Sequence, residues 1–195
     1  MISFDNIEEE MKNVSDYLKK KNIYVDAKWL KEKYNMYKKK ENIEECVYKD
    51  IISTNITEFI DKENLKILPS SEEKFKQEKA NIFLQINGYF NIAESKENME
   101  KKKGENLFEV LENFESKFLQ SEEEEVKKVE KTVLKYEFTD GKSVIHGFEY
   151  EDLKDFRQAM IQAFSTNKFI KVLIGPTFEV RRGIIYLKKD NIKLL

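Results

Sequence analysis

The reactive side chains that are rarest in this sequence limit the chemistry that the chain can perform. His146 is the only histidine and Cys46 is the only cysteine among 195 residues. A Ser–His–Asp or Cys–His site needs a histidine held between a nucleophile and an orienting partner, and a typical zinc site needs several Cys or His ligands. His146 instead stands beside Gly147 in a strand-like segment, and no partner is suggested by spacing. We therefore expect an ordinary strand residue, no metal site and no enzymatic activity.

Gly141, Lys142 and Ser143 imitate the end of a phosphate-binding loop. The complete motif needs a first glycine at the position that Tyr136 occupies here. The residues on both sides of Asp140 and Gly141 alternate as in a strand–turn–strand unit, whereas the motif joins a strand to a helix. We therefore predict a β-hairpin, no nucleotide or other cofactor, and no small-molecule substrate.

Charge and composition indicate a protein with a folded core and no excess of positive charge. Lys and Arg number 35 against 37 Asp and Glu, for a net charge of −2, and hydrophobic residues make up 40 %. A protein that mainly grips phosphates usually has a basic excess, so this balance argues against that class. The single cysteine suits a reducing compartment. We find no secretory signal core and no apolar run of membrane-spanning length, and we expect a soluble intracellular protein.

Three amphipathic segments with brief connections occupy residues 1–64. The first has apolar residues at helical spacing, acidic residues early and lysines late, which complements the helix dipole. Asp26 is a suitable N-cap for the second segment, whose apolar stripe includes Trp29 and Leu30, and Asn42 is suited to cap the third. Together they predict a three-helix bundle with Trp29 and Leu30 in its core.

After a polar connector at residues 65–79, strand-like and helical segments follow one another to the end of the sequence. We expect a helix at 152–165 and strands at 82–92, 134–138, 143–150, 169–174 and 183–187, with a short extra strand at 178–180. The order is strand, long insertion, hairpin, helix and closing strands. A five-stranded barrel with a helix between its third and fourth strands is the OB arrangement.

The predicted fold class is therefore α+β. A three-helix bundle over residues 1–64 precedes a five-stranded OB-fold β-barrel over residues 80–195. A long insertion, at about residues 95–130, separates the first two barrel strands. It is far longer than a hairpin needs, and loops of that length in compact domains are usually functional or disordered.

The insertion is dense in Lys and Glu yet carries an apolar stripe at helical spacing. Its members are Leu107, Phe108, Leu111, Phe114 and Phe118. Full burial of each such side chain contributes roughly 1.5–3 kcal/mol, so the stripe should be covered. Two interpretations stay open: a helix that docks in the groove of a partner, or a segment that folds back onto its own barrel. The preceding Lys101, Lys102 and Lys103 either contact DNA within a complex or are merely solvated.

Several short stretches resemble the RecQ-mediated genome instability protein 1 family, in the same order, from about residue 23 to the end. They include a V-x-x-x-W-L entry to the second helix, an L-Q-I-N strand, a T-D-G turn before a second hairpin strand, and the closing strands. In this sequence they lie at residues 25–30, 47–55, 84–87, 139–141, 147–150, 171–174, 182–187 and 191–195. The resemblance implies structural roles for six of these residues: Trp29, Leu30, Leu84, Ile86, Gly141 and Gly147.

The resemblance implies a non-catalytic scaffold. Family members join a type IA topoisomerase III and a RecQ-type helicase in a nuclear complex that dissolves double Holliday junctions and meets DNA mainly as a complex. The loop between the first two OB strands influences the topoisomerase gate. The resemblance also implies that Lys171 lies near the partner-binding face, together with Arg182, although a solvated edge lysine stays open. The sequence ends soon after one OB-fold, so we expect no second one.

A rival interpretation is an OB-fold protein that binds single-stranded nucleic acid on its own. Such proteins stack bases on aromatic side chains within a basic groove. The candidate rings are Phe83, Tyr89, Phe138 and Tyr186, although strand aromatics usually fill a barrel. The candidate basic rim consists of Arg181, Arg182, Lys188 and Lys189. Strong, salt-sensitive binding to oligonucleotides would favour this rival.

Overall fold

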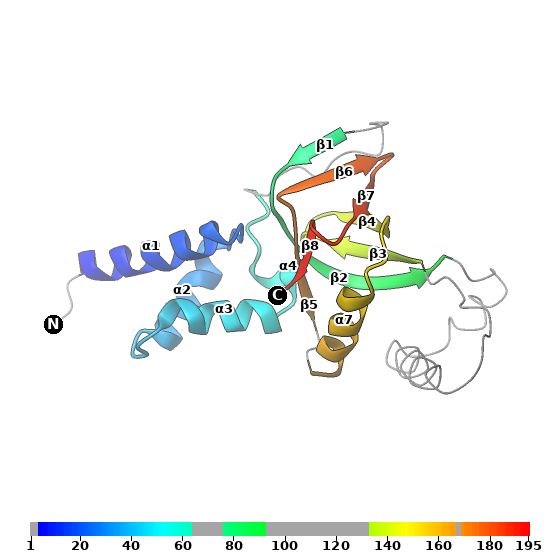
Figure 1. Cartoon of the computed structure of the whole chain (residues 1–195). Coiled ribbons are helices and arrows are strands. Elements are labelled where there is room, and N and C mark those ends of the chain that lie inside the picture. Colours follow the sequence, from blue (N-terminus) through cyan, green and yellow to red (C-terminus); the bar gives the residue numbers. More distant parts are fainter. Residues whose placement is uncertain (1–3, 64–75, 93–132, 167–168) are drawn as a thin grey trace.

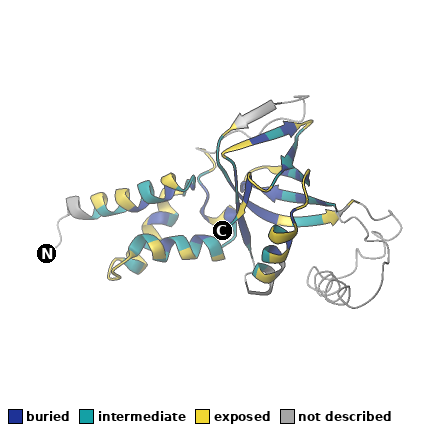
Figure 2. Ribbon diagram, in the orientation of Figure 1, coloured by how far each residue is buried: buried dark blue, intermediate teal, exposed yellow. Residues whose placement is uncertain are grey.

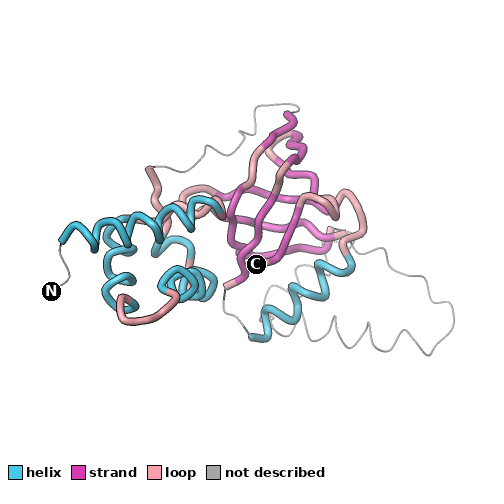
Figure 3. Tube along the Cα trace, turned by 60° about the vertical axis from the view of Figure 1, so that its left-hand side comes forward, coloured by secondary structure: helices cyan, strands magenta, loops and turns pink. Residues whose placement is uncertain are grey.

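The computed structural model describes residues 4–63, 76–92, 133–166 and 169–195, and it shows N-terminal helices followed by a curled β-sheet (Figure 1). The helices are α1 (Phe4–Lys20), α2 (Ala27–Tyr37), α3 (Ile43–Ser53), α4 (Ile56–Phe59) and α7 (Lys154–Thr166). Figures 1 and 3 place α1, α2 and α3 together on one side of the sheet, with α7 apart from them. This mixed α+β architecture agrees with the predicted class.

The start of α2 is fixed by the predicted cap. The Asp26 carboxylate accepts the backbone N–H groups of Lys28 and Trp29 at 2.9 and 3.0 Å, which satisfies two donors that a helix terminus leaves unpaired. Asn42 is the N-cap residue of α3, as expected, but the predicted side-chain cap is wrong, because the Asn42 side chain makes no cap hydrogen bond. The short helix α4 adds a turn that the three-helix prediction did not separate, and Asn55 caps it by accepting the Thr57 N–H at 3.2 Å.

The described residues form eight strands, whereas the sequence predicted five barrel strands and one short extra strand. The eight strands are β1 (Lys76–Lys79), β2 (Ile82–Asn91), β3 (Leu134–Thr139), β4 (Val144–Glu149), β5 (Ile170–Ile174), β6 (Thr177–Arg181), β7 (Ile184–Leu187) and β8 (Ile192–Leu194). Their order in the sheet is β1-β6-β7-β4-β3-β2-β5-β8. The segment predicted as a connector thus contains β1, which pairs with β6, and the extra strand expected at 178–180 is confirmed as β6.

The closing strand of the OB arrangement is divided in two, which explains part of the difference in strand number. β7 pairs in parallel with β4, and β8 pairs antiparallel with β5. Asn191 holds the turn between them: its Oδ1 accepts the Lys188 N–H at 2.8 Å and its Nδ2 donates to the Tyr186 carbonyl at 3.0 Å. β7 and β8 follow each other in the chain, but β7 lies near one end of the strand order and β8 lies at the other end. The sheet must therefore curl around its core.

Strand β2 is long enough to serve two neighbours. Its first residues pair with β5 and its later residues with β3, and the register shifts between Ile86 and Gly88. Such a bulge places one additional residue, here Asn87, in the strand and increases its bend. Side chains alternate between the two faces of a strand, so Leu84 and Ile86 point into the barrel and are 0 % and 4 % exposed.

Two hydrophobic cores support the fold (Figure 2). The barrel core is lined by β2 to β8 and by Leu153 and Met160 beside and within α7. The second core lies between the helices and the outer surface of the sheet, where Phe83 of β2 joins Leu30, Ile51 and other helix residues. The expected structural roles of Leu30, Leu84 and Ile86 are consistent with these positions. The second core attaches the helices to the barrel.

A buried ion pair fastens α7 to the barrel core. Arg157 donates to Glu149 at 2.6 Å and to Asp152 at 2.5 Å. Glu149 also accepts the Tyr136 hydroxyl at 2.7 Å and the Leu134 N–H at 3.1 Å. Burial, followed by the adjacent Glu149 carboxylate, raises the pKa of the Tyr136 hydroxyl. The buried carboxylate is therefore fully paired, as buried charges must be.

The two glycines singled out in the sequence stand where a side chain would collide. A Cβ on Gly147 would lie 2.5 Å from Phe138 Cε2 inside the barrel. Gly141 lies in the predicted β3–β4 hairpin with φ +92°, and a Cβ there would lie 2.6 Å from Ile60 Cγ2. The hairpin turn is therefore in close contact with the end of the helical region.

Candidate interaction surfaces on the barrel

The insertion begins and ends at neighbouring points of the barrel. Asn91 of β2 is paired with Leu134 of β3, and the Ile92 N–H donates to the Val133 carbonyl at 3.0 Å. The insertion thus joins two adjacent strands, as the predicted OB arrangement requires. Its candidate partner-binding residues lie outside the described residues: Lys101, Lys102, Lys103, Leu107, Phe108, Leu111, Phe114 and Phe118. At its root, Phe90 and Ile92 are 51 % and 44 % exposed.

The outer face of the sheet is divided into two parts, which we name by their residues. The covered half consists of Phe83, Gln85, Lys171 and Leu173, and its members are paired across β2 and β5. Phe83 and Leu173 belong to the hydrophobic core that the helices share with the sheet. The covered half is thus an internal junction between the helices and the barrel.

Lys171 is the charged residue at the centre of this junction. Its side chain is 0 % exposed, and its Nζ donates to the Thr54 carbonyl at 2.6 Å and to Gln85 Oε1 at 2.8 Å. Burial lowers the pKa of the Lys171 amine from 10.5 to about 8, against a smaller opposing effect of Glu58. Lys171 is therefore not the solvated edge lysine that the sequence left open, nor is it exposed on a partner-binding face, because the helices cover the outer face of β5 and β5 lies between β2 and β8.

Gln85 completes this junction by satisfying three polar groups at once. Its Oε1 accepts both the Lys171 amine and the backbone N–H of Ile56, the latter at 3.0 Å, and its Nε2 donates to Asn87 Oδ1 at 3.3 Å. Polar groups enclosed in this way are costly when they lose a partner. Gln85 and Lys171 therefore act together as a polar pin between α3, α4 and the barrel.

The open half of the outer face lies beyond the bulge of β2. Directly paired residues of neighbouring strands share a face, so the register defines a row across five strands. The row consists of Phe90, Lys135, Phe148, Tyr186 and Glu179. It contains three aromatic side chains, and it starts at the root of the insertion.

Cations lie over the rings of the open half. Tyr186 is 5.8 Å from Phe148 and 5.3 Å from Tyr150 between ring centroids. The Arg181 guanidinium is 4.9 Å from the Tyr186 centroid, and the Lys188 amine is 5.4 Å from that of Tyr150. Tyr150 is 56 % exposed. Rings and cations at these distances attract one another, and together they form a continuous aromatic and basic surface.

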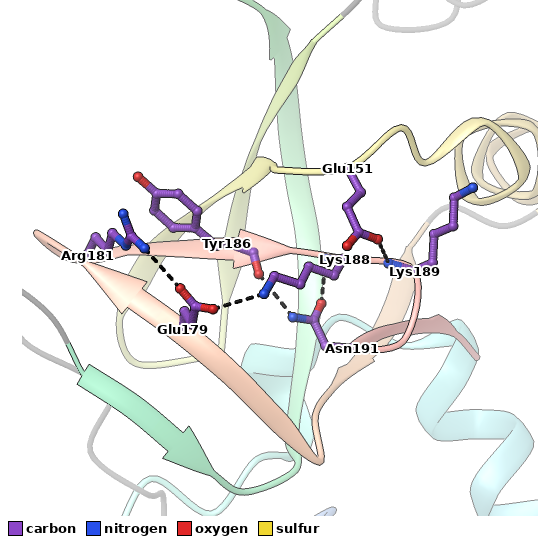
Figure 4. A network of polar contacts seen from close by, with 7 residues as sticks. All are labelled: Glu151, Glu179, Arg181, Tyr186, Lys188, Lys189 and Asn191. Atoms are coloured by element: carbon purple, nitrogen blue, oxygen red, sulfur yellow. Dashed lines mark hydrogen bonds and ion pairs between the residues drawn. The ribbon is translucent and has the colours of Figure 1, made fainter.

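Glu179 holds the two cations of this surface in place (Figure 4). Its carboxylate is 2.9 Å from Lys188 Nζ and 3.3 Å from Arg181 Nη2. The hydrogen bond from Lys188 lowers the pKa of the Glu179 carboxyl, and the same bond raises the pKa of the Lys188 amine. These pairs are accessible to water, where ion pairs are weak and exchangeable.

The remaining candidate residues have clear positions. Arg182 is exposed in the turn between β6 and β7, with φ 51°, so it is accessible as expected, although its contact with a partner stays a prediction. Trp29 packs at 5.5 Å from Phe59 in the second core, which favours its structural role. Of the four candidate stacking rings, Phe83 and Phe138 are buried and Tyr89 packs against the barrel core. Only the fourth, Tyr186, lies on the open half.

Sequence reasoning missed Phe90, Phe148 and Tyr150 as members of this surface. Alternation in β4 gives Phe148 the phase opposite to the buried Ile145 and Glu149, but alternation in β2 would place Phe90 in the same phase as the inward-facing Leu84 and Ile86. The pairing register, which brings them into one row with Tyr186, depends on the β2 bulge and on the parallel β4–β7 pair. Neither feature has a sequence signal as clear as that of the Asp140–Gly141 turn.

Two further observations concern metals and membranes. Within the described parts of the chain, no group of three or more His, Cys, Asp and Glu side chains is placed to hold a metal ion. None of the helices described here is both long enough and apolar enough to cross a bilayer.

The fold and its surfaces define an OB-fold domain joined to a helical region, with features of an interaction module. Residues 57–195 match the family model described as RMI1, N-terminal OB-fold domain. The chain therefore belongs to the RMI1 family, in agreement with the resemblance found in its sequence. This is a family of non-catalytic OB-fold scaffolds in genome maintenance. A comparison with curated protein sequences found no match.

Proposed function

We propose that this chain is the subunit that binds a type IA topoisomerase III and a RecQ-type helicase and adjusts the topoisomerase gate during double Holliday junction dissolution. The observation that carries this proposal is the rooting of the insertion on the paired ends of β2 and β3, in a chain of the RMI1 family. A segment of this length, anchored at both ends on a rigid barrel, is suited to reach into a neighbouring protein. No catalytic group is required for such a role.

The mechanism is a shift of the gate equilibrium. A ligand shifts a two-state equilibrium only by the difference between its affinities for the two states. The insertion would therefore bind one gate state better than the other, using the apolar stripe from Leu107 to Phe118 and the lysines at 101–103. The barrel holds the two ends of the insertion, so that its contacts with the gate are made without a large ordering cost at its root.

The remaining parts of the proposal concern partners and location. The helicase would contact a surface other than the insertion, and Arg182 on the β6–β7 turn is an accessible candidate for a partner contact. DNA would be met mainly through the assembled complex, since the net charge of −2 favours no strong general affinity for phosphates. Such work would place the protein in the nucleus.

The direct test replaces residues 98–128 by a Gly/Ser linker. We expect the variant to unfold cooperatively, because β2 and β3 remain paired, and to lose its effect on decatenation by topoisomerase III. Met36→Ala is a suitable control, because Met36 is a 64 % exposed apolar residue of α2, away from the barrel. An unchanged effect on decatenation by the folded linker variant would refute the proposed mechanism.

The rival function, a stand-alone single-strand binder, is separated by affinity. It predicts tight, salt-sensitive oligonucleotide binding by the isolated chain, with a dissociation constant well below the micromolar range. The scaffold proposal predicts micromolar or weaker binding at moderate salt. A filter-binding titration distinguishes the two functions.

A further inference from the structure

We propose that the helical region carries a binding site for the trimethylated lysine side chain of a protein segment, formed by the rings of Tyr17 and Tyr48 and the carboxylate of Glu45. In the free protein, Lys21 of the same chain occupies this site. The site lies where α1 meets α3, and it does not rest on the proposed contact with a topoisomerase.

The end of α1 fixes the position of Lys21. The following residue, Asn22, takes the left-handed conformation with φ 62°. The Asn22 N–H donates to the Lys19 carbonyl at 2.9 Å, and the Ile23 N–H donates to the Leu18 carbonyl at 3.0 Å. These two bonds are those of a Schellman cap, in which a residue such as Asn ends the helix with a sharp turn. The backbone at Lys21 is therefore held in one conformation.

The amine of Lys21 lies over two tyrosine rings that come from different helices. Its Nζ is 4.9 Å from the ring centroid of Tyr17 on α1 and 4.7 Å from that of Tyr48 on α3. A cation within about 6 Å of a ring centroid is attracted by the negative face of the ring. Aromatic rings that converge on one cation are also the means by which proteins recognise quaternary ammonium groups. Lys21 therefore stands in for a ligand cation.

Carboxylates beside the rings add negative charge to the site. Tyr17 donates its hydroxyl hydrogen bond to Glu45, in the first turn of α3. A hollow of about 680 Å³ adjoins Tyr17, and its lining includes Asp16 and Glu44. Lys19 also lines this hollow and is 3.7 Å from Asp16. The hollow offers room for the residues that flank a bound lysine in its own chain.

Hydration decides which cation the rings hold more tightly. An unmodified lysine ammonium is compact and strongly hydrated, so Lys21 loses contacts with water when it lies over the rings. A trimethylated ammonium keeps its positive charge and has no N–H group to hydrate, and its methyl groups bury apolar surface against the rings. The side chain of Lys21 is only half-buried. We therefore expect a trimethylated lysine to displace it.

The experiment is an NMR titration of the isotope-labelled full chain with the peptide Gly-Ser-Lys-Ser-Gly, whose lysine is either unmodified or trimethylated. We expect saturable shifts of the Tyr17, Lys21 and Tyr48 amides, with a dissociation constant of about 1 mM for the trimethylated peptide. The unmodified peptide should bind at least about fivefold more weakly. Tetramethylammonium should shift the same amides, because it presents the same cation without a peptide.

A pair of lysine variants separates ring contacts from general charge. Lys21→Ala vacates the rings and should raise affinity about two- to fivefold. Lys20→Ala removes the same charge from an exposed neighbour and should leave affinity nearly unchanged, because water and salt screen exposed charges. The gain expected from Lys21→Ala cannot arise from misfolding.

A second pair tests the ring of Tyr48. Tyr48→Leu should lower affinity about fivefold or more, whereas Tyr48→Phe keeps the ring and should retain the affinity of wild type. Circular dichroism and thermal unfolding verify that both variants remain folded.

Four results would overturn the inference. They are the absence of saturable shifts at millimolar peptide, equal affinity for the two peptides, equal gains from Lys21→Ala and Lys20→Ala, and unchanged affinity in folded Tyr48→Leu. Tighter binding of phosphocholine than of the trimethylated peptide would overturn the assignment of a lysine side chain as the ligand. The variant with a linker at residues 98–128 should bind the trimethylated peptide like wild type, so this proposal and the topoisomerase contact fail by separate measurements.

Discussion

The two halves of the outer sheet face use similar residue types in opposite ways. In the covered half, Lys171 and Gln85 are enclosed by helices and make short hydrogen bonds to neutral partners. In the open half, Lys188 and Arg181 remain at the surface, paired with an accessible carboxylate and lying over tyrosine rings. A lysine on this barrel can therefore be an internal structural pin or part of an interaction surface.

The difference shows that position in the sheet, more than residue type, decides the role of a charge. An enclosed cation loses its hydration, so each remaining hydrogen bond contributes more to stability. The same loss of hydration lowers the pKa of the amine. An exposed cation keeps its hydration and can exchange one anionic partner for another at little cost. The covered half should therefore control stability, and the open half should control binding.

The largest expected effect comes from removing the polar pin. Gln85→Leu leaves the buried Ile56 N–H without its partner and removes one of the two hydrogen-bond acceptors of the Lys171 amine, the other being the Thr54 carbonyl. We expect a loss of about 3 kcal/mol or more in the free energy of unfolding, measured by urea denaturation. Lys135→Met in the open half is the control and should change stability by less than about 0.5 kcal/mol. Equal losses in both variants would contradict the division of the face.

A glycine pair tests the same division through steric fit. Gly141→Ala forces a Cβ to within 2.6 Å of Ile60 at φ +92°, so we expect a loss of about 1–3 kcal/mol. Gly88→Ala lies on the outer face beyond the bulge, where nothing stands within 4 Å of the new Cβ. It should be neutral or slightly stabilising, because alanine has less backbone freedom to lose on folding. Thermal unfolding of both variants provides the comparison, and a larger loss in Gly88→Ala would argue against it.

The pH dependence of stability should reveal the enclosed amine. Burial lowers the folded pKa of Lys171 to about 8, below its ordinary value of 10.5, so the unfolded chain binds the proton more strongly. The cost of the charged amine is present below about pH 8 and is relieved as pH rises towards 10.5. Between pH 7.5 and 9.5, wild type should gain about 1–2 kcal/mol relative to Lys171→Met.

This window ends before the tyrosines interfere. Tyr17, Tyr34 and Tyr89 have pKa values raised to about 12, so their contribution to stability is lost only above about pH 10. Because wild type and Lys171→Met share these tyrosines, the difference between the two urea midpoints isolates the amine. A difference that does not change from pH 7.5 to 9.5 would show that Lys171 is not desolvated in solution.

The smallest effect is expected in the open half. Lys188→Met removes one accessible ion pair with Glu179, and it should leave the urea midpoint of unfolding unchanged within error in 0.15 M salt, because water and salt screen exposed pairs. Chemical denaturation is the measurement, with Lys31→Met as the matched removal of a charge on the exposed surface of α2. A midpoint lowered as far as that of Gln85→Leu would mean that this half of the sheet face is also structural.

Much of the fold could be predicted from the sequence because its signals are local. Asp26 is a helix cap, and Asp140–Gly141 is a hairpin turn, and both act on residues within a few positions. The pairing of β1 with β6, of β7 with β4 and of β8 with β5 depends on contacts between distant parts of the chain. Those pairings could therefore not be predicted from the sequence, and the number of strands was underestimated.

Among the candidate binding residues on the barrel, exposure to solvent could be predicted only for a residue in a turn. Arg182 lies next to Gly183 in a β-turn and is exposed as expected. Lys171 was misplaced, because in the sequence it is an ordinary strand residue, and only the tertiary packing of the helices encloses it. Phe148 and Tyr186 meet across a parallel pair whose partners are far apart in the sequence, so periodicity alone does not join them.

The central claim is that the segment between β2 and β3 binds a type IA topoisomerase III. The most direct test is a titration of the topoisomerase with the wild-type chain and with the variant in which a Gly/Ser linker replaces residues 98–128, by isothermal calorimetry. The account predicts saturable binding by wild type and its loss in the linker variant, while both unfold cooperatively. Binding of the folded linker variant with wild-type affinity would contradict the account.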